Sequence, residues 1–406
     1  MNQTAHFHLY IIGITWPPET FIERKIDGLV AQGVEVTVCA SGIKSSRKTA
    51  HSNLSLINLN PVSLQQKVNR LLLLLYKIPR FPVRAIRMWR IVSLHRQALW
   101  EKLRVFLQIL PLVSHKPDII HFEWNSAAIT YHFLTDILNC PMVVSCRGAQ
   151  IQIAPLNPLR KDIDDGLPIT FEKASAAHCV SHAISETAQG YGLDPNKAWI
   201  ITPAVDPYLF CPIAAKEYKG ILTVLTTGSV IWRKGYEYAV YAIRQLVDKG
   251  VQVRYEIIGG HQKDEYNRLL YTINDLDLEN HVCYLGKLNP SEVLERLQAA
   301  DVFLLSSLSE GISNAVLEAM ACGIPVVTTD VGGMREAVTD GVEGFVVPPR
   351  DPHAIADALS KLVESPSLRK VMGKAGRERI LQEFTLHQQT EAYLEMYKSV
   401  LSEQSS

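Results

Sequence analysis

Short apolar runs and longer amphipathic segments alternate along the second half of the chain. The amphipathic segments carry apolar residues at the 3.6-residue period of helices, and the apolar runs lie at 223–229, 253–260, 283–288, 301–307 and 324–329. Short runs of this kind are typical of strands buried on both faces of a parallel sheet. The pattern therefore predicts a series of β-α-β units.

The first half repeats this order less regularly. Helices are expected between paired strands, and the strands are expected at 7–13, 34–41, 118–124, 141–148 and 175–181. Residues 61–116 separate the two β-α-β units; they have helical periodicity that Pro79 and Pro82 interrupt. We interpret this segment as a helical insertion in the first domain.

The alternation breaks again near 206–220, and 406 residues are more than one ordinary core accommodates. We predict an α/β fold of two Rossmann-like domains that face a central cleft. The first domain covers 1–205 and the second covers 206–385. A C-terminal helix and tail, 386–406, is expected to return toward the first domain.

Composition favours a soluble protein of a reducing compartment. The seven cysteines are scattered and form no C-x-x-C pair, so neither a disulfide framework nor a zinc ribbon is expected. The opening HFHLYIIG has no charged leader and predicts a strand rather than a signal peptide, and Leu71–Leu75 is too short to span a bilayer. We expect a cytoplasmic protein.

Charge changes this picture in one place. Residues 61–116 contain eleven Lys and Arg against one Glu, a net charge of +10. One interpretation is peripheral contact with an anionic membrane that presents a lipid-linked acceptor. The alternative is a set of helices that cover the first sheet while their long basic side chains reach water. Nucleic acid is disfavoured because no binding module accompanies the charge.

The main candidate for chemistry is the segment SLSEGISNAVLEAMACGIPVV, in which Glu310 and Glu318 lie eight positions apart. Ser313 is a good N-cap, so a helix is expected to begin at Asn314. Glu310 then lies in the loop after a strand, and Glu318 lies one turn inside the helix. Free N–H groups at a helix start suit a diphosphate, and open α/β sheets bind ligands beyond the carboxyl ends of their strands.

A second element is expected at the same edge of the sheet. The strand 223–229 ends in Gly228-Ser229, and Arg233 and Lys234 stand just before a helix that begins near Gly235. Two cations at a helix start can offset the charge of a departing pyrophosphate. No carboxylate partner accompanies His178 and His182, so we expect no metal site.

These motifs resemble the retaining family-4 glycosyltransferases, which have the GT-B architecture. The resemblance rests on Lys234-Gly235, on Glu310 with Glu318, on AMACGIPVV and on Gly332-Gly333. PPETFI near the N-terminus is similar to the opening of bacterial exopolysaccharide and colanic-acid transferases of that family. The resemblance covers most of the chain except residues 61–116.

The resemblance implies a role for each matching residue. Glu310 would hold the donor sugar at the catalytic centre, Glu318 the ribose, and Lys234 with Arg233 the diphosphate. Other donor contacts would come from Gly13, Gly228, Leu285, Lys287, Leu288, Gly311, Ile312, Ser313 and Asn314. The donor is a nucleotide diphosphate sugar, and neither a cofactor nor a metal is expected.

Two departures from the family pattern concern the catalytic centre. Ser229 stands where the family usually has Arg, which removes one phosphate contact. Where many members have His-x-His, this chain has His121-Phe122-Glu123, so either His121 or Glu123 is expected at the anomeric carbon. Alternatively, His121 is a satisfied histidine at a strand end.

The predicted function is hexosyl transfer from a UDP- or GDP-linked sugar, with retention, to a saccharide or lipid-linked glycan in cell-surface polysaccharide synthesis. Two alternatives stay open. One is a catalytically silent subunit that binds nucleotide sugar in an assembly complex, which Ser229 and Glu123 favour. The other is a nucleotide-sugar hydrolase or phosphorylase on the same scaffold.

Overall fold

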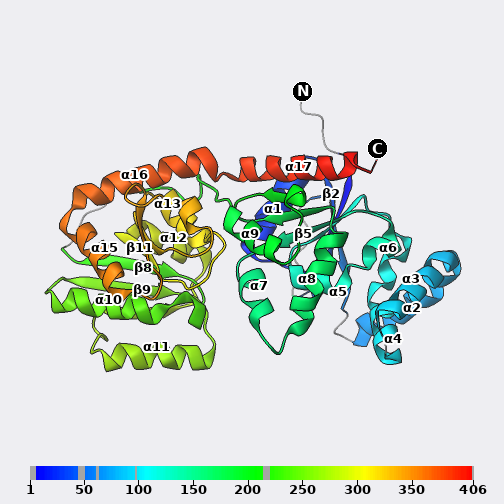
Figure 1. Cartoon of the computed structure of the whole chain (residues 1–406), viewed down its shortest axis with the longest axis horizontal. Coiled ribbons are helices and arrows are strands. Elements are labelled where there is room, and N and C mark those ends of the chain that lie inside the picture. Colours follow the sequence, from blue (N-terminus) through cyan, green and yellow to red (C-terminus); the bar gives the residue numbers. More distant parts are fainter. Residues whose placement is uncertain (1–5, 44–50, 61–63, 97, 214–219, 405–406) are drawn as a thin grey trace. The chain divides into compact units, whose positions relative to one another are not determined.

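The computed structural model describes residues 6–43, 51–60, 64–96, 98–213 and 220–404. Residues 61–63 and 97 of the basic stretch, and 214–219 of the expected junction, lie outside the described residues. Residues 1–180, 185–201 and 390–406 form one compact unit, and residues 181–184 and 202–389 form a second (Figure 1). We call these unit 1 and unit 2 and describe each by itself.

Unit 1 contains a seven-stranded parallel sheet in the order β3-β2-β1-β4-β5-β6-β7. Its strands are β1 His8–Ile12, β2 Glu35–Ala40, β3 Leu54–Asn58, β4 Ile119–Phe122, β5 Met142–Cys146, β6 Ala176–Cys179 and β7 Ala198–Ile200. All five strands predicted for this half are confirmed. The two that the pattern missed, β3 and β7, are the edge strands, and their side chains are mostly only half-buried.

The helices around this sheet are α1 Thr20–Ala31, α5 Asn125–Tyr131, α6 Leu134–Leu138, α7 Ala149–Gln152, α8 Lys161–Lys173, α9 His182–Gly190 and α17 Leu386–Ser402. The single helix expected after β4 is two helices, α5 and α6, because the chain turns at His132 and Phe133. From Thr390 onward α17 belongs to unit 1, and its Tyr393 and Tyr397 are buried in the core of that unit.

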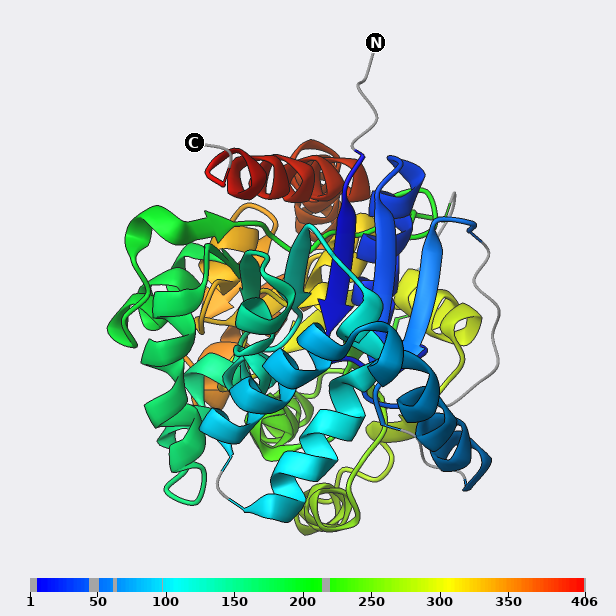
Figure 2. The same cartoon turned by 90° about the vertical axis from the view of Figure 1, so that its right-hand side faces the viewer.

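The basic insertion forms three helices that lie together at one side of unit 1, α2 Leu64–Arg80, α3 Pro82–His95 and α4 Leu99–Ile109 (Figure 2). Pro82 occupies the first turn of α3, where its missing N–H costs no hydrogen bond. Short buried stripes fix these helices to the domain, for example Ala85, Met88 and Val92 on α3. The other faces of the helices are exposed.

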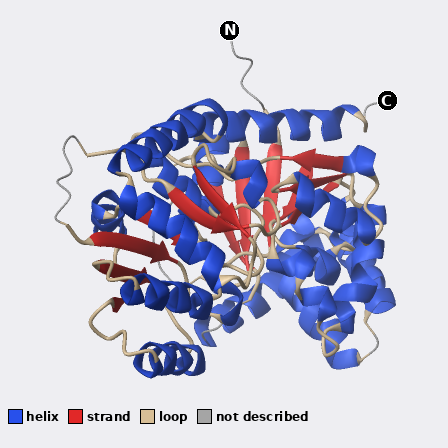
Figure 3. Ribbon diagram, turned by 60° about the vertical axis from the view of Figure 1, so that its left-hand side comes forward, coloured by secondary structure: helices blue, strands red, loops and turns tan. Residues whose placement is uncertain are grey.

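Unit 2 contains a six-stranded parallel sheet in the order β10-β9-β8-β11-β12-β13. Its strands are β8 Leu222–Thr227, β9 Val253–Ile258, β10 Val282–Gly286, β11 Val302–Leu305, β12 Val326–Thr329 and β13 Gly344–Val347. Helices lie on both faces (Figure 3): α10 Tyr236–Asp248, α11 Lys263–Asp275, α12 Pro290–Ala299, α13 Asn314–Ala321, α14 Met334–Ala337, α15 Pro352–Glu364 and α16 Pro366–Glu383. All five strands predicted here are confirmed, so the two Rossmann-like α/β domains are confirmed as the fold class.

The order of the strands reverses once in each sheet. In unit 1 the chain runs outward from β1 to β3 and then returns to place β4 on the other side of β1. In unit 2 it runs from β8 to β10 and returns to place β11 beside β8. Loops diverge at such a reversal, which makes it the usual ligand site of an open parallel sheet.

Within the described helices, none is both long and apolar enough to span a bilayer.

Candidate functional site

Two loops meet at the reversal point of unit 2. One follows β8 and carries Arg233 and Lys234 in a short 3₁₀ turn, and the other follows β11 and leads into α13. The Leu308 N–H donates to the Arg233 carbonyl at 2.7 Å, and the Ser306 hydroxyl donates to the Lys234 carbonyl at 3.1 Å. These bonds hold the two predicted motifs side by side.

The centre of this site is an ion pair between Lys234 and Glu310. The Lys234 Nζ lies 2.5 Å from Glu310 Oε1, and the Ser307 hydroxyl donates to the same oxygen at 2.8 Å. The side chains are 13% and 10% exposed, so the pair is shielded without being sealed. An ammonium has three protons and a carboxylate has two oxygens, so each partner retains bonding capacity for a ligand.

Close backbone packing at this site requires glycine. Gly235 has φ +60, and a Cβ there would lie 2.3 Å from the Ser306 carbonyl oxygen. Gly332 has φ +54, and a Cβ there would lie 1.8 Å from the Glu310 carbonyl oxygen. A larger residue at Gly235 would push the β8 and β11 loops apart, and one at Gly332 would push the loop after β12 away from the β11 loop. The Lys-Gly and Gly-Gly motifs thus fix the position of the Lys234–Glu310 pair.

Helix α13 begins at Asn314, as predicted, but Ser313 makes no side-chain capping bond. The first N–H groups of the helix are therefore left without a side-chain cap from this residue. The Asn314 Oδ1 atom is buried and has no hydrogen-bond partner among the described residues. A buried amide oxygen without a partner is costly, and a bound ligand with a donor group would satisfy it.

The remaining candidates of unit 2 surround this centre. Glu318 is half-buried one turn along α13, and the side chain of Ile312 packs into the core, which leaves only its backbone for a ligand. Lys287 is exposed just after β10, while Leu285 and Leu288 are partly buried beside the core. Sequence reasoning missed Ser307 and also Tyr236, whose buried hydroxyl donates to the Gly228 carbonyl at 2.8 Å.

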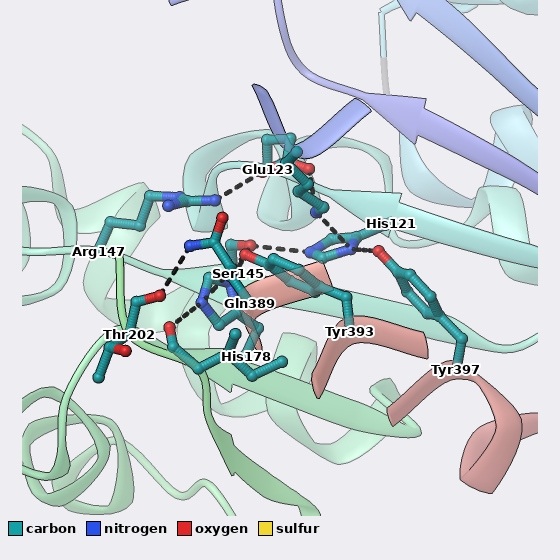
Figure 4. A network of polar contacts seen from close by, with 11 residues as sticks. His121, Glu123, Ser145, Arg147, His178, Thr202, Gln389, Tyr393 and Tyr397 are labelled. Atoms are coloured by element: carbon teal, nitrogen blue, oxygen red, sulfur yellow. Dashed lines mark hydrogen bonds and ion pairs between the residues drawn. The ribbon is translucent and has the colours of Figure 1, made fainter. Parts of the chain in front are cut away.

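The other three candidates, Gly13, His121 and Glu123, lie in unit 1 at its own strand reversal. Gly13 directly follows β1, and Glu123 directly follows the Phe122 end of β4. Glu123 accepts from Lys25 at 2.5 Å and from Arg147 at 2.8 Å (Figure 4). Both His121 and Glu123 are fully buried.

A chain of hydrogen bonds fixes the protonation of His121. The Lys25 ammonium can only donate, so it bonds to an unprotonated His121 Nδ1 at 3.1 Å, an atom that the Tyr397 hydroxyl also contacts. The His121 Nε2–H then donates to the Ser145 hydroxyl at 2.8 Å. Ser145 in turn donates to His178 Nδ1, and His178 Nε2–H donates to the Ile201 carbonyl. Every group in this hydrogen-bond network can therefore act consistently as a donor or as an acceptor.

Electrostatics agree with neutral histidines and a charged carboxylate. Burial, reinforced by Lys25 and Arg147, holds the pKa of His121 and of His178 well below the ordinary value. Burial alone would raise the pKa of Glu123, but Lys25 and Arg147 outweigh it and lower this pKa to about 2. Burial lowers the pKa of Lys25 to about 8, although Glu123 opposes this shift.

These contacts place His121 and Glu123 in a buried polar network of unit 1. Their polar atoms are enclosed and engaged within unit 1, the arrangement described by the alternative of a satisfied strand-end histidine. A role for either residue at the anomeric carbon stays a prediction. Sequence reasoning missed the partners because Lys25, Arg147 and Tyr397 come from three distant segments with no shared motif.

Comparison with known proteins identifies the family of this chain. Residues 18–209 match the family model described as Glycosyltransferase Family 4, and residues 214–379 match the one described as Glycosyl transferases group 1. The chain belongs to the family-4 glycosyltransferases. The group 1 match, residues 214–379, contains the Lys234 and Glu310 loops.

Relatives and solved structures extend this likeness. The chain is 34% identical to the colanic acid biosynthesis glycosyltransferase WcaL of Salmonella typhimurium, over 48% of this chain and 49% of that protein. It is 30% identical to a D-inositol 3-phosphate glycosyltransferase of Pseudarthrobacter chlorophenolicus, over 64% and 66% of the two chains. The chain spans about half the length of most of the curated relatives it matches.

The fold is also that of a solved structure. Anabaena HepE in complex with UDP and glucose matches with a TM-score of 0.72 and 18% identity, over 97% of this chain and 100% of that one. At this level of identity the match shows the shared two-domain α/β fold.

Proposed function

We propose that this chain transfers a hexosyl group from a UDP- or GDP-linked sugar to a saccharide or lipid-linked glycan, with retention at the anomeric carbon, in the synthesis of cell-surface polysaccharide. The observation that supports this most directly is the Lys234–Glu310 pair beside the start of α13. It combines a cation, a carboxylate and uncapped N–H groups at the strand reversal of one sheet.

Each part has a task in the departure of a nucleoside diphosphate. Lys234 and Arg233 neutralise the charge that grows on the β-phosphate, and the first N–H groups of α13 add the positive end of the helix dipole. Glu310 accepts hydroxyl protons of the donor sugar and holds its ring in place. Interactions that strengthen as the bond breaks lower the barrier more than uniform binding does.

Other residues select the donor. Glu318 would accept from the ribose hydroxyls, and Asn314 would use its unpartnered Oδ1 atom on a sugar or ribose hydroxyl. Leu285 and Leu288 would form one wall of the base pocket beside Lys287. We propose that the reaction uses no cofactor and no metal, because cationic side chains and N–H groups supply the positive charge.

The names of the relatives guide the choice of substrates. HepE was crystallised with UDP and glucose, which favours a UDP-linked hexose as donor. WcaL is named for colanic acid biosynthesis, which favours an exopolysaccharide as product. The D-inositol 3-phosphate glycosyltransferase is named for a phosphate-bearing compound, which favours a phosphate-bearing acceptor.

We also propose that the protein is cytoplasmic and meets an anionic membrane through the insertion 61–116. Large apolar side chains are exposed on all three helices: Val68, Leu72, Leu75, Tyr76, Val83, Ile86, Leu94, Leu99 and Trp100. The four on α2 recur at helical spacing along one face, and Arg80, Arg87 and Arg90 are exposed nearby. Apolar side chains flanked by arginines suit the boundary between acyl chains and anionic headgroups.

The donor assignment can be tested with a panel of nucleotide sugars. Binding is measured by thermal shift, and transfer is then measured with membrane extract as the source of acceptor. We expect a UDP- or GDP-hexose to raise the melting temperature and to label a product. Binding without any transfer would support the silent subunit, and release of free sugar without acceptor would support the hydrolase.

The membrane contact has a separate test. Sedimentation with phosphatidylglycerol vesicles should remove the protein from solution, and phosphatidylcholine vesicles should not. Leu75→Glu should weaken this binding, whereas Leu159→Glu, at an exposed position outside the insertion, should not. Equal binding by both variants would contradict the proposed surface.

A further inference from the structure

A cavity of about 700 Å³ lies in unit 1 among α2, α4 and the end of α5. Three arginines line it, Arg70, Arg96 and Arg104. Leu59 and Asn60, just after β3, form another part of its wall, so the cavity lies toward the edge of the sheet at which the parallel strands end. The volume is in the range of small-molecule sites.

Two of these arginines are fixed by neutral partners. The Arg70 guanidinium, in a side chain only 8% exposed, donates to the carbonyls of Leu107 and Gln108 at 2.9 and 2.8 Å. These carbonyls belong to the last turn of α4, where a cation is favourable. Arg96 donates to the Thr130 carbonyl at 2.8 Å. Carbonyl oxygens satisfy the N–H groups but leave both positive charges in place.

The third arginine is available to a ligand. Arg104 is exposed and makes no hydrogen bond or ion pair with the described residues. Among the described residues that line the cavity, Glu101 is the one acidic residue, so three guanidinium groups face a single carboxylate there. An excess of two positive charges in a concave site favours an anion, and guanidinium groups match phosphate oxygens in geometry.

We infer that this cavity binds the phosphate-bearing part of the glycosyl acceptor, a sugar joined to a phosphate or diphosphate ester. That the ligand is a glycosyl acceptor depends on the proposed function, whereas the anion-binding site is inferred from the cavity alone. Gln108 and Tyr131 add polar groups for sugar hydroxyls, and the Tyr131 ring and Leu107 add apolar surface. Trp100, 83% exposed, precedes Arg104 by one turn of α4, so a lipid attached to the phosphate would leave along an apolar face.

The test is calorimetric titration of the full-length protein with inorganic pyrophosphate while saturating UDP occupies the donor site. We expect wild type to bind pyrophosphate, and Arg104→Ala to bind it about ten-fold more weakly or worse. Arg90→Ala is the matched control because Arg90 is an exposed arginine of the same insertion that does not line the cavity. It should bind within about two-fold of wild type.

Two results would overturn the site: no pyrophosphate binding by wild type, or equal weakening in both variants. Failure of both UDP and GDP to bind wild type would instead contradict the donor site, and the titration without nucleotide would still decide the cavity. A second titration includes phosphatidylglycerol vesicles, which carry no saccharide. Unchanged pyrophosphate affinity supports an acceptor site, whereas displacement by the vesicles would assign the cavity to bilayer headgroups.

Discussion

Each unit contains a lysine–glutamate pair at its strand reversal, and the two pairs differ mainly in exposure. Lys25 and Lys234 both follow the first strand of their sheet, and Glu123 and Glu310 both follow the fourth. Both pairs have an N···O distance of 2.5 Å. Lys25 and Glu123 are 2% and 0% exposed, against 13% and 10% for Lys234 and Glu310.

The surroundings explain the difference. Arg147, His121 and two tyrosines of α17 enclose the pair of unit 1, whereas the pair of unit 2 lies beside an uncapped helix start. The same two residue types are thus sealed in the interior in unit 1 and left partly open in unit 2, where we propose that they bind the donor. Motif spacing alone does not distinguish these cases.

Removing each glutamate in turn is the most direct test of the difference between the two ion pairs. Glu123→Ala leaves Lys25 and Arg147 buried without a counter-charge, so we expect it to reduce the free energy of unfolding by about 3–5 kcal/mol. Glu310→Ala should cost less, about 1–2 kcal/mol, because the charge left on Lys234 retains partial contact with water. Urea unfolding followed by tryptophan fluorescence measures both. Similar losses in the two variants would contradict the distinction.

Turnover should depend strongly on the lysine of the unit 2 pair. Lys234→Met keeps the length of the side chain but removes the charge that we propose neutralises the leaving diphosphate, and we expect kcat to fall about 10²–10³-fold. Lys374→Met removes an equally positive but exposed charge on α16 and should leave kcat unchanged. Wild-type turnover in Lys234→Met would refute the phosphate role.

Acid should weaken unit 1 through its buried histidines. The folded-state pKa values of His121 and His178 lie well below the ordinary value, so only the unfolded chain takes up these protons as the pH falls below about 6.5. Their contribution to stability is present above that pH and is lost below it, by up to about 1.4 kcal/mol per pH unit for each histidine.

Urea unfolding at several pH values between 7 and 5 measures this slope. His178→Asn should have a shallower slope than wild type, whatever its stability at pH 7. Below about pH 4.5 Glu123, whose pKa is lowered to about 2, adds a further loss as it becomes protonated only in the unfolded chain. An unchanged slope in His178→Asn would contradict its neutral state in the folded protein.

The smallest expected effect concerns the donor. Glu318→Ala should weaken the binding of UDP or GDP about ten-fold, the value of one or two hydrogen bonds from ribose hydroxyls to a carboxylate. Calorimetric titration with the nucleoside diphosphate measures it. Glu295→Ala, which removes an exposed carboxylate of α12, is the control and should bind normally. Unchanged affinity in Glu318→Ala would remove its assigned role.

The hydrophobic pattern predicts the central strands of both sheets correctly because these strands are buried on both faces and read as continuous apolar runs. The strands that it misses, β3, β7 and β13, all lie at sheet edges. Partial exposure weakens the pattern in β3 and β7, whereas β13 is mostly buried but only four residues long. The start of α13 is also predicted correctly. The apolar runs and the N-cap signal of α13 can be predicted because each is contained within a few consecutive residues.

The candidate site divides in the same way. Lys234, Glu310 and the glycines around them are predictable because each follows its strand within one short loop. The network around Glu123 is not, because tertiary packing brings Lys25, Arg147 and Tyr393 together from separate helices and strands. His121 matches the first histidine of the family pattern and Glu123 departs from the second, and burial gives both residues contacts that the pattern does not contain.

The return of α17 to unit 1 affects how the chain is made. Tyr393 and Tyr397 leave the ribosome almost two hundred residues after β7, the last strand of the sheet against which they pack. Unit 2 has all of its strands and helices by then and can fold first. Unit 1, although its sheet is synthesised first, completes its core only after residue 397, so a nascent chain that stops earlier exposes a charged, unfinished interior to chaperones and proteases.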